Sequence, residues 1–400
     1  MTKALEGVRV LDLTNVLAGP LCAYQLALLG ADVIKVEAPG TGDLARQLGN
    51  DRGLNKQLMG ASFLAQNAGK KSVTVNLKSP EGKEVLRRLV ASADVLVENF
   101  RPGVMTRLGV GYEDLKKINE RLVYCAITGF GQDGPMRDAP AYDQIIQGLS
   151  GMMSVTGDEK CAPLRAGYPV ADTVSGIVGA FSICAALLRR HSTGEGSFID
   201  VAMLDSALVT MGWVVSNYLI AGTEPKPHGN DNFTAAPSGT FRTGSGPLNI
   251  AANKQDQFEA LARVIGRPEL ITDPRFAERE ARKQNRPALN DAIESALVHR
   301  TATEWEPILT KAGIPTGCVL NVGEALASDQ LEGRQFLQEF DDAPGVGRPI
   351  RVARTGFRMQ GADPEAGSAP PVLGADTDAV LASLGYSSEQ IAELRNCGAV

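Results

Sequence analysis

Short apolar runs in the first half of the chain predict strands, and the segments between them predict helices. The strand-like runs are residues 8–13, 31–36, 72–77, 95–97, 122–127 and 197–201. Helix-compatible stretches follow at residues 21–29, 79–91 and 171–190, and from 202 to about 221. Strands that alternate with helices predict an α/β fold with a mainly parallel sheet and helices on both of its faces.

The pattern changes after residue 221. Residues 222–239 are rich in Gly, Pro and polar residues and are interpreted as a linker, and residues 240–252 predict a hairpin with a Gly-rich turn. Helical segments with charged faces follow to about residue 312, and the tail returns to helix at 376–394. This change predicts a second, smaller domain of α+β type.

Composition excludes few classes of protein. The chain has 400 residues, 44% of them hydrophobic, and a formal net charge of −6, which argues mildly against a nucleic-acid binder. Its opening residues do not resemble a signal peptide, and no uninterrupted apolar run approaches about 20 residues, so a cytoplasmic protein without a membrane span is expected. Three histidines without ligand spacing and scattered cysteines argue against a metal site.

One acidic residue stands out for its position. Asp172 follows a loop that contains Pro169 and precedes a long stretch of small and apolar residues. It has two interpretations: a helix N-cap, or a nucleophile that the helix N-terminus keeps ionised. Dinucleotide chemistry is disfavoured, because the first strand–loop–helix turn, residues 17–23, lacks the GxGxxG pattern.

A series of motifs resembles one family along nearly the whole chain. The motifs are residues 5–20 (LEGVRVLDLTNVLAGP), 29–37 (LGADVIKVE), 97–103 (VENFRPG), 107–112 (RLGVGY), 127–131 (ITGFG), 142–144 (YDQ), 194–196 (GEG) and 373–377 (LGADT). Each motif is weak by itself, but their order and spacing together are similar to those of the class III, or CaiB/BaiF, CoA-transferases.

The resemblance implies an architecture. A large Rossmann-like, CoA-binding domain would comprise residues 1–221 and 330–400, with a small domain and its linkers at 222–329. Two such chains would interlock as a homodimer, with each active site between the large domain of one chain and the small domain of the other. Residues 229–239 are either a lid over that site or only the interdomain linker.

The resemblance also implies roles for individual residues. Asp172 falls on the family's catalytic aspartate, and Tyr142 and Asp143 fall beside it. The CoA-binding positions are Asn15 and Val16 near the reacting end, Val75 where adenine packs, and Asn99, Phe100 and Arg107. Lys70 and Lys71 are either partners of the CoA phosphates or surface lysines before a strand.

The implied activity is transfer of CoA from an acyl-CoA to a carboxylic acid. Within the family, the chain is most similar to members that use succinyl-CoA as donor and a dicarboxylic acid as acceptor. Asp172 would form an anhydride and then an aspartyl-CoA thioester, with CoA as substrate and no tightly bound cofactor. Arg46 and Arg165 would bind a distal carboxylate or serve structure only. Ala38 and Asn67-Ala68-Gly69 depart from the dicarboxylate members and leave the acceptor open.

Two alternatives to transfer stay open. Acyl-CoA racemases of the same family use a histidine base where this chain has Tyr142, and a tyrosine of ordinary pKa (~10) is a poor base near neutral pH. A CoA-thioester-binding protein without turnover is the other, with Asp172 a mere N-cap.

Overall fold

The strand-like runs of the first half form one six-stranded parallel sheet in the computed structural model, which describes residues 2–400. Its strands are β1 (Arg9–Asp12), β2 (Asp32–Glu37), β3 (Lys70–Thr74), β4 (Val95–Glu98), β5 (Val123–Thr128) and β6 (Ser197–Ala202). The strand order is β3-β2-β1-β4-β5-β6, and Val10 of β1 pairs with Val33 on one side and Val95 on the other. The predicted α/β class and parallel sheet are confirmed.

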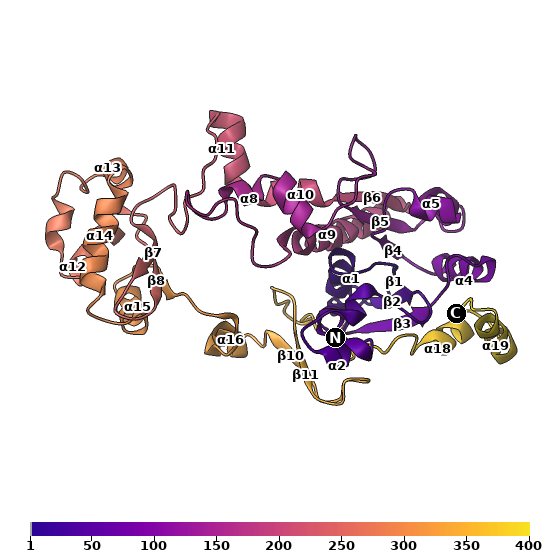
Figure 1. Ribbon diagram of the computed structural model, residues 1–400. Helices are drawn as coiled ribbons and strands as arrows, with labels where there is room; N and C mark the ends of the chain where they lie inside the picture. The colour runs from indigo at the N-terminus through magenta and orange to yellow at the C-terminus, as the bar shows by residue number, and fades with distance from the viewer. Residues whose placement is uncertain (1) are drawn as a thin grey trace. The chain divides into compact units, whose positions relative to one another are not determined.

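Helices cover both faces of this sheet (Figure 1). Side chains alternate between the faces along each strand. Val10 and its neighbours pack with α1 (Ala18–Leu28) and α9 (Val170–Thr193), whereas Leu11 packs into a second core with α4 (Pro80–Ala91). That second core also holds α18 (Thr377–Ser383) and α19 (Ser388–Asn396), so the C-terminal tail returns to the sheet.

Close packing of α1 against α9 depends on small residues. A Cβ atom on Gly176 would lie 2.6 Å from the Ala18 carbonyl oxygen, so only glycine permits this approach. By length and composition α9 is apolar enough to cross a membrane, a test that a core helix also passes, and here α9 packs against α1, β5 and β6. Tight α1–α9 packing sets Asp172, in the first turn of α9, beside the residues that follow β1.

Other short helices lie between and after these strands. They are η1 (Leu44–Gln47), α2 (Arg52–Lys56), α3 (Ala61–Leu64), α5 (Val104–Leu108), α6 (Tyr112–Lys116), α7 (Asp143–Leu149), α10 (Met203–Thr210) and α11 (Trp213–Ala221). Two more, α8 (Met152–Val155) and α17 (Asp329–Gly333), lie where the chain passes between its two compact units. The helix expected from 202 to 221 bends by 82° between α10 and α11, at Gly212. Strands β10 (Leu337–Phe340) and β11 (Ile350–Ala353) form an antiparallel pair.

A second sheet and its own apolar core build the smaller unit. Strands β7 (Ser238–Arg242), β8 (Pro247–Ala251) and β9 (Thr316–Cys318) are antiparallel. They share this apolar core with α12 (Gln255–Val264), η2 (Pro268–Ile271), α14 (Arg286–Leu297) and α15 (Ala302–Lys311), whereas α13 (Arg279–Gln284) and α16 (Val322–Leu326) contribute no residue to it. The hairpin predicted at 240–252 is confirmed as β7 and β8.

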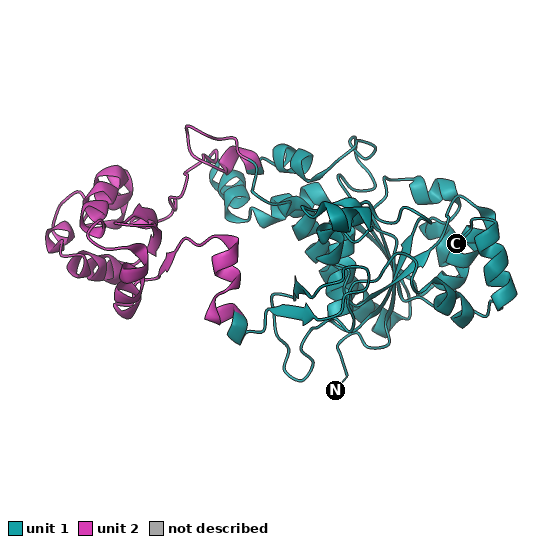
Figure 2. Cartoon of the chain, turned by 60° about the horizontal axis from the view of Figure 1, so that its bottom comes forward, with its two compact units in different colours: residues 1–152, 165–223, 332–400 teal, residues 153–164, 224–331 magenta. Residues whose placement is uncertain are grey.

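Contacts divide the chain into two units (Figure 2). The larger unit comprises the described residues up to Met152, Arg165–Thr223 and Glu332–Val400, and the smaller unit comprises Met153–Leu164 and Glu224–Leu331. The predicted large domain, residues 1–221 and 330–400, includes residues 153–164. The segment instead contacts the other unit, where the Gly229 amide donates to the Gly157 carbonyl at 2.6 Å.

Candidate active site

A cavity opens where the strand order of the sheet reverses. The chain winds outward in opposite directions from β1 and β4, and ligands of open α/β sheets bind beyond the carboxyl ends of the strands at such a point. The cavity has a volume of about 250 Å³. Six of the predicted site residues line it: Asn15, Val16, Asn99, Phe100, Tyr142 and Asp172.

Asp172 enters this cavity from the first turn of α9. The helix is capped at Pro169, without a side-chain hydrogen bond from the capping residue. Asp172 is therefore inside the helix, and its interpretation as an N-cap is wrong. Within residues 2–400 its carboxylate accepts no hydrogen bond, so it is free to react.

Asp143 supplies the missing cap from 28 residues earlier in the chain. Its Oδ1 accepts hydrogen bonds from the Ala171 amide at 2.8 Å and the Asp172 amide at 3.3 Å. Its Oδ2 accepts from Gln147 Nε2 at 2.6 Å and lies 3.9 Å from Arg165 Nη2. Asp143 thus satisfies the amide donors of the α9 N-terminus and leaves Asp172 for another role.

The environment of Asp172 opposes its charge. Burial, and secondly the Asp143 carboxylate, raise the pKa of Asp172 from 3.8 to about 7. The helix N-terminus was expected to favour the ionised form, but burial and the Asp143 charge outweigh that effect, and Asp143 accepts the amides of Ala171 and Asp172. A desolvated carboxylate is a stronger base, and hence a stronger nucleophile, once it is ionised.

The loop after β1 is clamped by the loop after β4. Asn99 Oδ1 accepts from the Asn15 amide, and Asn99 Nδ2 donates to the Asn15 carbonyl, both at 2.8 Å. The Glu98 carboxylate accepts from the Phe100 amide at 2.7 Å, which fixes the next turn. These contacts give Asn15, Asn99 and Phe100 defined positions on the cavity wall.

The structure contradicts both interpretations of Lys70, as a partner of the CoA phosphates and as a surface lysine. Its ammonium group is buried and donates to Asp12 (2.8 Å), the Pro20 carbonyl (2.9 Å) and Asn67 (2.8 Å). With its three donors used, it has none left for a CoA phosphate. The physical reason is that β3 begins at Lys70 itself, so Lys70 points inward while Lys71 points to solvent and pairs with Asp32 at 2.6 Å.

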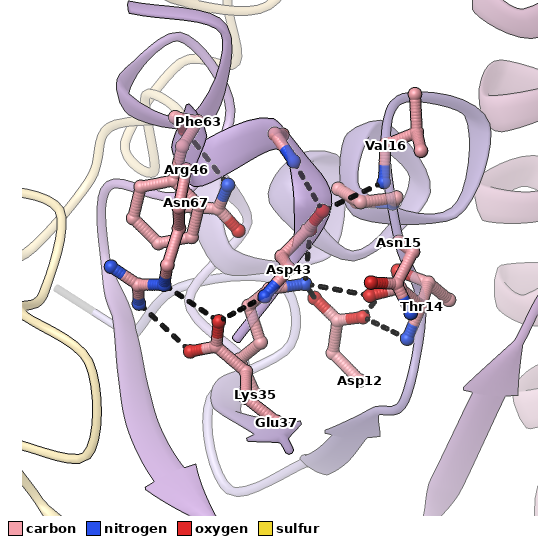
Figure 3. A network of polar contacts seen from close by, with 12 residues as sticks. Asp12, Thr14, Asn15, Val16, Lys35, Glu37, Asp43, Arg46, Phe63 and Asn67 are labelled. Atoms are coloured by element: carbon pink, nitrogen blue, oxygen red, sulfur yellow. Dashed lines mark hydrogen bonds and ion pairs between the residues drawn. The ribbon is translucent and has the colours of Figure 1, made fainter. Parts of the chain in front are cut away.

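The structure also decides between the two interpretations of Arg46. It is buried and pairs with Glu37 through two hydrogen bonds of 2.7 and 2.8 Å (Figure 3). Its guanidinium lies 3.7 Å from the centre of the Phe63 ring. The interpretation as a carboxylate anchor for substrate is wrong, and the structural interpretation is confirmed.

The other predicted residues lie outside the cavity lining. Val75 is 2% exposed in the core and presents no surface to adenine, which contradicts its predicted role. Arg107 is exposed on α5, and Lys71 is exposed on β3. Arg165 is half-exposed beside Asp143 and so remains a candidate for binding an acceptor carboxylate.

Arg101, Arg137 and Met203 line the cavity and were missed. Met203 follows β6 directly, so the rule that sites lie beyond carboxyl strand ends would have indicated it. Arg137 lies in a loop without regular structure, where the sequence carries no such signal. Among residues 2–400 no group of His, Cys, Asp and Glu has the arrangement of a metal site.

Comparison with known protein families identifies the family to which this chain belongs. The family model for CoA-transferase family III matches residues 5–377. The chain belongs to this family. It is an enzyme of the class III CoA-transferases, which use CoA thioesters as substrates.

The alignments with individual relatives cover most of this chain. The mouse succinyl-CoA:glutarate CoA-transferase is 36% identical and the alignment covers 100% of the chain and 90% of the relative. The acetyl-CoA:oxalate CoA-transferase of Acetobacter aceti is 40% identical over 87% of the chain and 89% of the relative. A CaiB/BaiF family protein from Brucella suis has a similar structure, with a TM-score of 0.85, 36% identity and coverage of 96% of this chain and 100% of that one.

Proposed function

We propose that Asp172 is the covalent nucleophile of a CoA transfer from succinyl-CoA to a dicarboxylic acid. The observation that carries the proposal is the free Asp172 carboxylate in a cavity beyond the carboxyl ends of β1 and β4. The relatives named succinyl-CoA:glutarate CoA-transferase support the choice of donor and acceptor.

The reaction consists of two exchanges: CoA moves first from the succinyl group to Asp172 and then from Asp172 to the acceptor. The Asp172 carboxylate attacks the thioester carbonyl of succinyl-CoA, and CoA thiolate leaves as the mixed anhydride forms. The thiolate attacks the aspartyl carbonyl, which releases succinate and leaves an aspartyl-CoA thioester. The acceptor carboxylate attacks that thioester to form a second anhydride, and the thiolate then takes the acceptor's acyl group and frees Asp172.

The cavity walls suit this route. An anhydride is hydrolysed by water, so the site must shield it, and the rings of Phe100 and Tyr142 line the wall near Asp172. Racemisation needs a base at the acyl α-carbon, and the residues that line the cavity include no histidine. The geometry therefore favours transfer.

The test is trapping of the aspartyl thioester. Incubation with succinyl-CoA alone is expected to add the mass of CoA less one water to the protein, and hydroxylamine is expected to displace the CoA. Asp172→Asn should abolish the adduct. Asp205→Asn is the matched control, because Asp205 lies in the first turn of α10 and outside the cavity lining, and it should keep the adduct. An adduct that persists in Asp172→Asn would exclude this nucleophile.

The protein is further proposed to act as an interlocked homodimer. The larger unit leaves large apolar side chains exposed on α9 and α11, among them Phe181, Leu188, Trp213 and Ile220. An exposed apolar surface of this kind marks an interaction site. Light scattering should give twice the mass of 42.3 kDa, and a monomer at assay concentration would contradict the dimer.

A further inference from the structure

The segment Thr14–Val16 is bonded to side chains at all six of its backbone polar groups. Figure 3 shows the contacts with Asp12, Lys35 and Asp43. The partners are Asp12 for the Thr14 amide (3.0 Å), Lys35 for the Thr14 carbonyl (2.8 Å), Asn99 for the Asn15 amide and carbonyl (2.8 Å each), Asp43 for the Val16 amide (2.9 Å) and Gln66 for the Val16 carbonyl (2.7 Å). Side chains from several separate segments therefore determine the path of this loop.

Val16 needs that restraint. Its φ is 71°, in the left-handed region, which a β-branched residue adopts only at a cost in free energy. Such a conformation persists only where the surroundings over-determine it, and it concentrates at functional sites. Val16 lines the cavity that holds Asp172, so its conformation shapes the cavity wall.

Asp43 is one of the buried side chains that restrain the segment. It is 1% exposed, and its Oδ1 accepts from both the Val16 amide and the Ala45 amide, at 2.9 Å each. Its Oδ2 lies 3.0 Å from Lys35 Nζ as a buried ion pair. The same ammonium group bonds the Thr14 carbonyl, so one Lys35–Asp43 pair reaches both ends of the segment.

The negative charge of Asp43 is part of a cluster of buried ion pairs next to the Thr14–Val16 segment. Lys35 also lies 3.7 Å from Asp12, and Asp12 pairs with Lys70 at 2.8 Å. Two buried carboxylates therefore face two buried ammonium groups. Removal of one charge leaves its partner without full compensation in a buried site, which displaces the groups that it bonds.

We propose that Asp43 is a positioning residue for the transfer reaction, which fixes Val16 in its left-handed conformation through the buried Lys35–Asp43 pair. The inference rests on the proposed role of Asp172, since Val16 shares a cavity with that carboxylate. Asp43 itself lies outside the cavity lining and acts through the loop. A small displacement of a cavity wall is sufficient to slow a reaction that depends on alignment.

The first test replaces Asp43 with asparagine, which keeps the size of the side chain and removes its charge. The rate of the CoA adduct's formation from succinyl-CoA should fall about 10- to 100-fold. Asp94→Asn is the matched control, because Asp94 also bonds a backbone amide (Arg9, 2.8 Å) and an arginine (Arg190, 2.8 Å), but it directly precedes β4 and so lies at the amino ends of the strands, opposite the cavity. This control should keep the parental rate within about twofold.

A second variant separates positioning from general support of the fold. Glycine adopts the left-handed region without strain, so Val16→Gly removes the need for restraint. Asp43→Asn should then reduce the rate by a smaller factor in the Val16→Gly background than in the parent. An equal factor in both backgrounds would overturn the proposal, because a purely structural role for Asp43 would not depend on residue 16.

Hydrogen–deuterium exchange tests the restraint without reference to the chemistry. Amides of residues 14–16 should exchange faster in Asp43→Asn than in the parent. If that variant does not fold, Gln66→Met removes the donor to the Val16 carbonyl and should have the same effect on exchange and rate. Unchanged exchange, or faster exchange with the parental rate of adduct formation, would overturn the proposal. A parent that forms no adduct contradicts the role of Asp172 instead, and the exchange result still decides the restraint.

Discussion

The substitution Asp143→Asn tests how the pKa of Asp172 is set. Burial and, secondly, the neighbouring Asp143 carboxylate together raise the pKa of Asp172 to about 7. Asparagine removes the neighbouring charge but keeps an oxygen that can accept the Ala171 amide, now bonded at 2.8 Å. The pKa of Asp172 should therefore fall while α9 keeps its cap.

The size of the effect follows from the ionised fraction of Asp172. With a pKa of about 7, roughly ten-elevenths of the enzyme is ionised at pH 8 and about one-eleventh at pH 6, so kcat/KM should drop about tenfold between them. In Asp143→Asn the rising limb should move to lower pH and the drop should shrink. The new amide would face Gln147 Nε2, now 2.6 Å from Asp143 Oδ2, and an unmatched donor pair should cost about 1–3 kcal/mol of stability.

The assay is kcat/KM for succinyl-CoA from pH 5.5 to 8.5 in the parent, Asp143→Asn and Asp205→Asn. A phosphate group of CoA also titrates near pH ~6, but that ionisation belongs to the substrate and is the same for all three proteins. Only a shift confined to Asp143→Asn reports on Asp172. If the rising limb of the pH profile of kcat/KM stays in place in Asp143→Asn, or moves to higher pH, the electrostatic coupling between the two carboxylates is refuted.

Three further predictions concern residues around the site. Arg46→Met leaves Glu37 buried without its partner, so urea unfolding should show a loss of about 3–5 kcal/mol, with no change in KM for the acceptor in the folded enzyme; a rise in that KM would restore the substrate role. Burial raises the pKa of Glu98 to about 7, above its ordinary 4.5, so the folded state loses stability as pH rises from about 4.5 to 7. Glu98→Gln should remove a dependence of about 3 kcal/mol between pH 5 and pH 8, and an equal dependence in both proteins would contradict this. Arg165→Ala should raise KM for glutarate about tenfold while KM for succinyl-CoA stays constant, and equal changes in both would assign Arg165 to general structure.

The centre of the sheet was predictable because β1, β2, β4 and β5 are buried on both faces. Such strands appear in a sequence as continuous apolar runs, and each of the six runs does contain a strand. The order of the strands is not encoded locally, and it is the order that creates the cavity between β1 and β4. The position of Asp172 came from its place before a long helix, together with the resemblance to family III.

Lys70 and Arg46 show where a local pattern fails. Both are charged residues near strand or turn signals, and such residues are usually solvated. Their burial depends on partners at the ends of other strands, Asp12 at the end of β1 for Lys70 and Glu37 at the end of β2 for Arg46. A shift of two residues in the start of β3 was sufficient to turn Lys70 from a presumed surface residue into a core residue.

The two acids at the start of α9 show why a local sequence does not assign a nucleophile. Asp172 has the position of a cap, yet Asp143 makes the capping hydrogen bonds from another helix. The assignment has a chemical consequence, since a carboxylate that accepts several hydrogen bonds has its lone pairs occupied and is a weaker nucleophile. Asp143 also lowers the tendency of Asp172 to ionise while it holds the backbone of Asp172 in place. One carboxylate therefore both orients the second and raises its basicity, and this division of roles exists only in the folded chain.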